Sequence, residues 1–164
     1  DQLMNPCWAL MVGFEDSIGA DWAGAFVHDS FLTWVARNSS KPGRPTALES
    51  WVLHADPDWT EHHWETDPDQ VTSMMLTEFW RVLGNLPQEP VVAKAHRWKF
   101  AIPATDCTEL SLSDTTRGVH VCGDWLAGGR VEGAFLSGLS AAGRILNRLR
   151  PAVLSRETQK TLFS

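Results

Sequence analysis

The feature that most constrains the fold lies in the last third of the chain. Val119–Cys122 reads as a short strand of the buried type, and it ends in Gly123-Asp124. The glycine-rich turn Ala127-Gly128-Gly129 follows and leads into a helix predicted from about residue 130 to 149, with Pro151 as its stop. The first half of this helix is rich in small residues. Small residues let a helix pack closely against a neighbouring helix or strand.

This strand, turn and helix suit a nucleotide cofactor. A helix N-terminus presents unpaired N–H groups and about half a positive charge, so it attracts anions. Glycines before the helix let the backbone approach a phosphate or a flat ring. The Asp124 carboxylate can accept hydrogen bonds from sugar hydroxyls. The alternative is purely structural, with the glycines giving clearance to a helix packed on a sheet.

The first 56 residues predict an antiparallel sheet with short connections. Apolar runs at residues 7–14, 25–28, 33–37 and 48–55 read as strands, and the polar run 38–43 reads as a loop. In residues 48–55, alternation places Ser50, Val52 and His54 on one face. Trp51 and Leu53 lie on the other face.

An acidic segment and a helix follow. Residues 56–66 read as a solvated acidic loop; the alternative, a metal site, lacks the H-E-x-x-H spacing of zinc-binding helices. Residues 68–83 read as a helix, with Asp67 as N-cap, Gln70 completing a capping box and Gly84 after the end. Its apolar stripe consists of Val71, Met74, Met75, Phe79, Val82 and Leu83.

A long strand is predicted from about residue 91 to 102. Alternation puts His96 and Trp98 on a largely apolar face, and Arg97 and Lys99 on the other. His96 is then either a hydrogen-bonded core histidine or half of a His–Trp pair that faces a ligand.

Composition excludes several classes of partner. The 164 residues carry a net charge of −6, which argues against nucleic acid and anionic membranes. No apolar run reaches the ~18 residues of a membrane span. The three cysteines, Cys7, Cys107 and Cys122, do not form a C-x-x-C motif, so we expect neither a disulfide framework nor a metal site. This cysteine usage predicts a reducing compartment and therefore a cytoplasmic location.

Several stretches resemble flavoproteins. Residues 116–124 (TRGVHVCGD) resemble the second FAD fingerprint of glutathione-reductase-type flavoproteins. Residues 123–138 (GDWLAGGRVEGAFLSG) resemble the C-terminal FAD segment of flavin amine-oxidase-like proteins, and are most similar to the renalase-like branch. Residues 36–44, 49–54 and 95–98 also resemble that branch.

The resemblance implies FAD as cofactor and a small-molecule substrate. It places Gly123 and Asp124 at the ribityl or pyrophosphate region of FAD. The helix start, with Gly129, Arg130, Val131, Glu132 and Gly133, would then face the pyrimidine edge or the phosphates. His96, Trp98 and Trp125 are candidates for shaping the substrate pocket, whereas no catalytic side chain is predicted.

Three functions are compatible with this resemblance. Renalase-like enzymes oxidise isomers of dihydronicotinamide dinucleotides and pass the electrons to oxygen. Amine oxidation is the first alternative, weakened by the absence of Tyr, which would form an aromatic cage beside the flavin. A non-catalytic binding domain that has kept the fold is the second.

The chain departs from these flavoproteins in one respect. Their opening strand–G-x-G-x-x-G–helix is absent from the 164 residues. We therefore expect the C-terminal half of a renalase-like protein, of class α+β / α/β, which requires the N-terminal FAD domain as its partner. Residues 1–104 would form a substrate-domain portion, 105–150 the closing FAD segment and 151–164 a tail. Alone, the chain is expected to be inactive.

Overall fold

The computed structural model describes residues 4–105, 107 and 109–161, with side chains as far as residue 149. These residues form a mixed α and β fold in two compact units: the first is Asn5–Ala101, and the second contains the described residues from Ile102 onwards together with Met4. Among the described residues, no helix has the length and the apolar character needed to cross a membrane.

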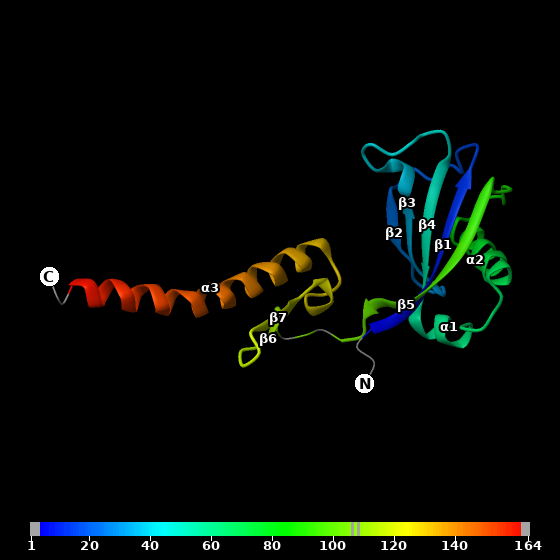
Figure 1. The fold of residues 1–164 in the computed structure, drawn as a ribbon. Helices are drawn as coiled ribbons and strands as arrows, with labels where there is room; N and C mark the ends of the chain where they lie inside the picture. The colour runs from blue at the N-terminus through cyan, green and yellow to red at the C-terminus, as the bar shows by residue number, and fades with distance from the viewer. Residues whose placement is uncertain (1–3, 106, 108, 162–164) are drawn as a thin grey trace. The chain divides into compact units, whose positions relative to one another are not determined.

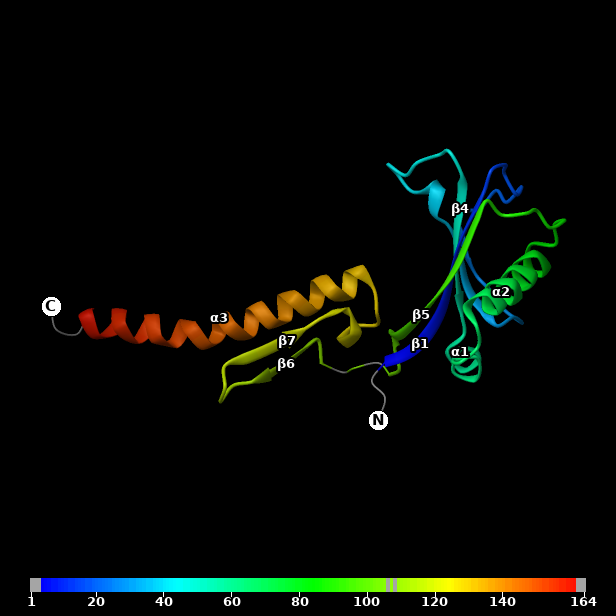
Figure 2. The same cartoon turned by 45° about the vertical axis from the view of Figure 1, so that its right-hand side comes forward.

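The first unit is built on a five-stranded antiparallel sheet, with strand order β2-β3-β4-β1-β5. Its strands are β1 (Met4–Phe14), β2 (Gly24–Phe26), β3 (Leu32–Arg37), β4 (Glu49–Ala55) and β5 (Val92–Pro103). Strands were predicted at all five places, although β2 ends at Phe26 and does not reach His28. The 3₁₀ turn η1 (Asn38–Ser40) follows β3, and the helices α1 (Pro57–His62) and α2 (Pro68–Leu83) lie on one side of the sheet (Figures 1 and 2).

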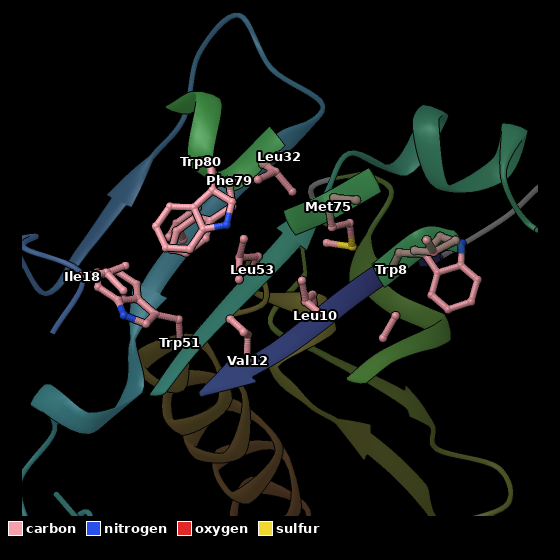
Figure 3. Packing of buried hydrophobic residues seen from close by; sticks show 14 of the residues in the cluster. Trp8, Leu10, Val12, Ile18, Leu32, Trp51, Leu53, Met75, Phe79 and Trp80 are labelled. Atoms are coloured by element: carbon pink, nitrogen blue, oxygen red, sulfur yellow. The ribbon is translucent and has the colours of Figure 1, made fainter. Parts of the chain in front are cut away.

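The core lies between α2 and the sheet (Figure 3). Trp51 and Leu53 of β4 are buried and His54 is only partly so, as their alternation predicted. From β1 the core receives Trp8, Leu10, Val12 and Phe14. From α2 it receives Val71, Met75, Phe79 and Trp80, and the partly buried Leu83 packs against it. The predicted stripe is therefore correct for four residues, misses Trp80 and wrongly includes the exposed Met74.

Helix α2 begins and ends as predicted. The Asp67 carboxylate accepts hydrogen bonds from the N–H groups of Asp69 and Gln70, and Gly84 follows the helix in the left-handed conformation, with φ 68°. The amide of Gly84 donates to the carbonyl of Trp80 at 3.0 Å. Side-chain capping and a glycine terminator therefore fix both ends of this helix.

The acidic loop expected at residues 56–66 is wrong. Residues Pro57–His62 form α1, because the Asp56 carboxylate accepts from the N–H groups of Asp58 and Trp59 and Pro57 suits the first turn. The Trp59 ring then stacks between Phe31 and His63, at centroid distances of 4.3 and 4.1 Å. Local capping and aromatic packing thus order a segment whose charge suggested a loop.

The predicted apolar face of β5 is exposed, so the interpretation of His96 as a core histidine is wrong. Ala95 and Arg97, on the opposite face, point to the core. The Arg97 guanidinium lies 4.4 Å from the ring centroid of Trp64 and 5.5 Å from that of Trp8. Because an arginine can cover indole faces in this way, it occupies a core-facing position that alternation assigned to solvent.

The second unit contains a hairpin and a long helix. Its elements are β6 (Ser111–Asp114), β7 (Val119–Cys122), the 3₁₀ turn η2 (Asp124–Leu126) and α3 (Val131–Thr161). Figure 2 shows α3 beside the hairpin. Strand β7 was predicted to be buried, but it is largely exposed, because its neighbours among the described residues are only β6 and α3.

Helix α3 differs from the prediction at its end, whereas its small residues pack closely, as predicted. Its backbone continues through position 151 to Thr161, so Pro151 does not terminate it. A proline removes one helical hydrogen bond, but its fixed φ is compatible with a helix. The small residues Gly133, Ser137 and Ala141 are buried, whereas large apolar ones are exposed. The exposed ones include Val131, Phe135, Leu139, Leu146 and Leu149.

Candidate functional site

The connection from β7 to α3 is a folded backbone turn. The carbonyl of Asp124 accepts from the N–H groups of Ala127 and Gly129, at 2.8 and 2.9 Å. Gly128 and Gly129 have φ values of 81° and 66°, a conformation that a side chain disfavours. Leu126 is fully buried and anchors the turn. The predicted glycine-rich turn therefore exists, and its two glycines are required by the backbone.

Two further glycines are required by close contacts. A Cβ atom on Gly133 would lie 2.2 Å from the carbonyl oxygen of Ala127, so the first turn of α3 presses against the backbone of the connection. A Cβ atom on Gly123 would lie 2.6 Å from the Nε1 atom of the Trp125 indole. The Trp125 ring therefore packs over the end of β7, and it can do so because Gly123 has no side chain.

Serine hydroxyls join α3 to the hairpin. The Ser137 hydroxyl is fully buried, accepts from the Gly123 N–H at 2.8 Å and donates to the carbonyl of Leu110. One helical turn later, the hydroxyls of Ser111 and Ser140 lie 2.8 Å apart. These bonds fix the start of α3 relative to the end of β7. In the sequence, Ser137 counted only as one of the small residues of this helix, and its hydrogen-bonding role was not predicted.

The polar groups at the connection can receive a ligand. The exposed Asp124 carboxylate accepts from the Trp125 N–H at 3.0 Å through Oδ1. The first helical bond runs from the Ala134 N–H to the Arg130 carbonyl at 2.9 Å. Over the described part of the chain, no carbonyl or side chain accepts from the N–H groups of residues 131–133. The carboxylate can accept from the hydroxyls of a flavin nucleotide, and the N–H groups can donate to its phosphates.

The structure therefore brings most of the predicted site residues together. Gly123, Asp124, Trp125 and residues 129–133 occupy this single connection, with Arg130, Val131 and Glu132 exposed. His96 and Trp98 form a separate exposed pair on β5, in the other unit, with ring centroids 4.4 Å apart.

The open face of the five-stranded sheet carries further aromatic groups that the predicted site omitted. Trp34 of β3 pairs with Phe26 on one neighbouring strand, β2, and with His54 on the other, β4. The rings of Phe26 and Trp34 are 4.7 Å apart, and burial lowers the pKa of His54. The alternation in residues 49–55 assigned His54 to this face, but the pairing with Trp34 depends on strand order.

The adjacent histidines of the acidic segment have local partners. Nδ1 of His62 lies 2.6 Å from the carbonyl oxygen of Asp58, and Nδ1 of His63 lies 2.9 Å from that of Trp59. Within the residues that the structure describes, no three His, Cys, Asp or Glu side chains gather in an arrangement suited to a metal ion.

Comparison with known families identifies the class of protein. A family model described as flavin containing amine oxidoreductase matches residues 7–146. The match includes nearly all of the first unit and, in the second, the hairpin, the connection and the first half of α3. The chain belongs to the flavin-containing amine oxidoreductase family, which implies a flavin cofactor, an oxidoreductase activity of the parent protein and a small-molecule substrate.

Proposed function

We propose that the chain belongs to a renalase-like oxidase that uses FAD and oxidises isomers of dihydronicotinamide dinucleotides with oxygen. The observation that carries the proposal is the β7–α3 connection, where the Asp124 carboxylate and the free N–H groups of residues 131–133 lie together. The sequence stretches similar to the renalase-like branch support the choice of substrate. FAD, when bound, supplies the hydride acceptor.

The chain's own residues would bind and orient the cofactor. Asp124 would accept hydrogen bonds from the ribityl or pyrophosphate region, and the amides of residues 131–133 would face the pyrimidine edge or the phosphates. The positive end of the α3 dipole stabilises negative charge at this position. The candidates for shaping the substrate pocket are His96 and Trp98 on β5 and, in the other unit, Trp125. No side chain is required as a general base, because hydride transfer needs only orientation and exclusion of water.

The proposal assigns different roles to three segments of the chain. Residues 1–104 would form a substrate-domain portion, 105–150 the closing FAD segment and 151–164 a tail. The division between compact units at residues 101 and 102 supports this assignment. The ADP half of FAD requires a G-x-G-x-x-G turn, which the 164 residues lack, so an N-terminal FAD domain would be the partner and the chain alone would be inactive.

Amine oxidation is the second candidate, because the family is defined by flavin-containing amine oxidoreductases. Anaerobic titration of the full-length parent separates the two. We expect dihydronicotinamide isomers to bleach the flavin absorbance within seconds and amines to leave it unchanged. Bleaching by amines alone would replace the first proposal with the second. A full-length protein without flavin absorbance would favour a non-catalytic binding domain.

Replacing Asp124 by alanine tests the cofactor assignment. Loss of hydrogen bonds to cofactor hydroxyls costs roughly 1–3 kcal/mol, so FAD affinity should fall about 5- to 150-fold. Thermal stability of the apoprotein should change little, because the carboxylate is exposed and bonds only to the neighbouring N–H of Trp125. Flavin occupancy after dialysis measures the effect. Glu109→Gln, which removes an exposed carboxylate charge from the same unit, is the control and should leave occupancy unchanged. Equal retention by Asp124→Ala would refute the assignment.

A further inference from the structure

The basic residues of the first 80 positions are concentrated in one place. Arg37, Lys41 and Arg44 are the only Lys or Arg in residues 1–80, where thirteen Asp and Glu also occur. All three lie within eight consecutive residues that contain no acidic side chain. A positive cluster in an otherwise acidic segment indicates attraction of an anion at this position.

The structure folds these residues into two successive turns. The N–H of Lys41 donates to the carbonyl of Asn38, and the N–H of Arg44 donates to the carbonyl of Lys41, each at 3.3 Å. Gly43 continues the turn with φ 74°. Lys41 and Arg44 are exposed, and the Lys41 ammonium donates to the neutral side chain of Asn38 at 3.1 Å. Among the ion pairs of the described residues, none includes Arg37, Lys41 or Arg44.

These turns border a hollow of about 310 Å³, which we call the β3–β4 hollow. Its polar lining includes Glu15, Ser17, Arg37, Ser39, Ser40 and Glu49. Because a water molecule occupies about 30 Å³ of liquid, this volume admits a phosphate group together with several waters.

Arg37 has a hydrogen-bonding group without a protein partner. Its Nη1 atom donates to the carbonyl of Ala20 at 2.8 Å, which fixes the guanidinium. Its Nε atom is buried and finds no acceptor among the described residues. Buried donors are usually paired, so the guanidinium of Arg37 is incompletely satisfied by the described residues; as a residue that lines the hollow, it supplies a positive charge that attracts a phosphate.

The two carboxylates of the hollow differ. The oxygens of Glu49 accept from the Ser17 hydroxyl at 2.7 Å, the Ile18 N–H at 3.3 Å and the Trp51 Nε1 atom at 3.0 Å. Neutral donors therefore occupy the oxygens of Glu49, although its negative charge remains. Glu15 also carries a charge that opposes an anion, and because its side chain is exposed, its removal should strengthen binding.

We propose that the β3–β4 hollow and the adjoining turns bind the phosphate groups of the dinucleotide substrate. The inference rests on the proposed function for the identity of the ligand. A dinucleotide carries a pyrophosphate in addition to its reacting ring, and Arg37, Lys41 and Arg44 are the Lys and Arg residues of the segment that forms the hollow. The hollow would thus select dinucleotides over substrates that lack phosphate.

Equilibrium dialysis of the 164-residue chain tests this site without flavin or turnover. The probes are ADP, inorganic pyrophosphate and adenosine at low ionic strength. We expect ADP to bind and adenosine not to. The double variant Lys41→Gln/Arg44→Gln should weaken ADP binding about tenfold, and Glu15→Gln should tighten it about threefold. The control Arg117→Gln/Arg148→Gln, which removes the same charge from exposed positions of the other unit, should leave ADP affinity unchanged.

Three results would overturn the proposal: unchanged ADP affinity in Lys41→Gln/Arg44→Gln, an equal loss in the control variant, or failure of inorganic pyrophosphate to displace ADP. Circular dichroism of each variant confirms that the chain remains folded. Flavin bleaching by dihydronicotinamide isomers in the parent protein is measured separately. Bleaching without ADP binding by the chain refutes only the hollow, and ADP binding without bleaching refutes only the reaction.

Discussion

Replacing Gly133 by alanine will destabilise the unit formed by the hairpin and α3. The added Cβ would lie 2.2 Å from the carbonyl oxygen of Ala127 and 2.9 Å from its Cβ, and the nearest atom belongs to the backbone, which cannot rotate away. Overpacking of this kind costs about 1–3 kcal/mol, enough to exceed the gain of about 1 kcal/mol that alanine brings to a helix. Amide hydrogen exchange over residues 110–149 and thermal unfolding would measure the loss.

Gly138 provides the matched control, five residues further along the same helix. No atom lies within 4 Å of a Cβ built on Gly138. Gly138→Ala should therefore stabilise α3 by about 0.5–1 kcal/mol, through helix propensity alone. If both variants prove equally stable, the close contact between α3 and the connection does not exist.

The second large effect is expected in the core of the first unit. Met75 is fully buried between α2 and the sheet, and Met75→Ala should lower the free energy of unfolding by about 2–5 kcal/mol. Its neighbour Met74 has 36% of its surface exposed, so Met74→Ala should cost much less, about 0.5 kcal/mol. Urea unfolding followed by tryptophan fluorescence compares them directly. Equal losses would show that α2 presents a different face to the sheet.

Local sequence signals determined the ends of several elements. Asp67 and Gly84 predicted where α2 begins and ends, because a side-chain cap and a left-handed glycine act within a few residues of the chain. The Gly-Asp and Gly-Gly pairs predicted the β7–α3 connection for the same reason. Here the required backbone conformation, with positive φ at Gly128 and Gly129, is itself a local property. The same motifs also indicated the family.

Tertiary packing decided what local patterns could not. Alternation in β5 separated two faces correctly but assigned the apolar one to the core, because it took no account of Arg97 covering the indoles of Trp8 and Trp64. In α3, the large apolar Phe135 and Leu139 are exposed, and the buried stripe consists of Gly133, Ser137 and Ala141. Small residues bury a helix by allowing close approach, and periodicity does not record that distance.

The sequence by itself thus determined the family, the five strands of the sheet, helix α2 and the residues of the β7–α3 connection, since each follows from groups close together in the chain. Only the tertiary structure decided the partners across the sheet. It paired Trp34 with His54, closed the β3–β4 hollow around Arg37 and placed the Ser137 hydroxyl between Gly123 and Leu110. The two hydrogen bonds of Ser137, for example, join residues that are 14 and 27 positions apart in the chain. No short-range pattern encodes such contacts.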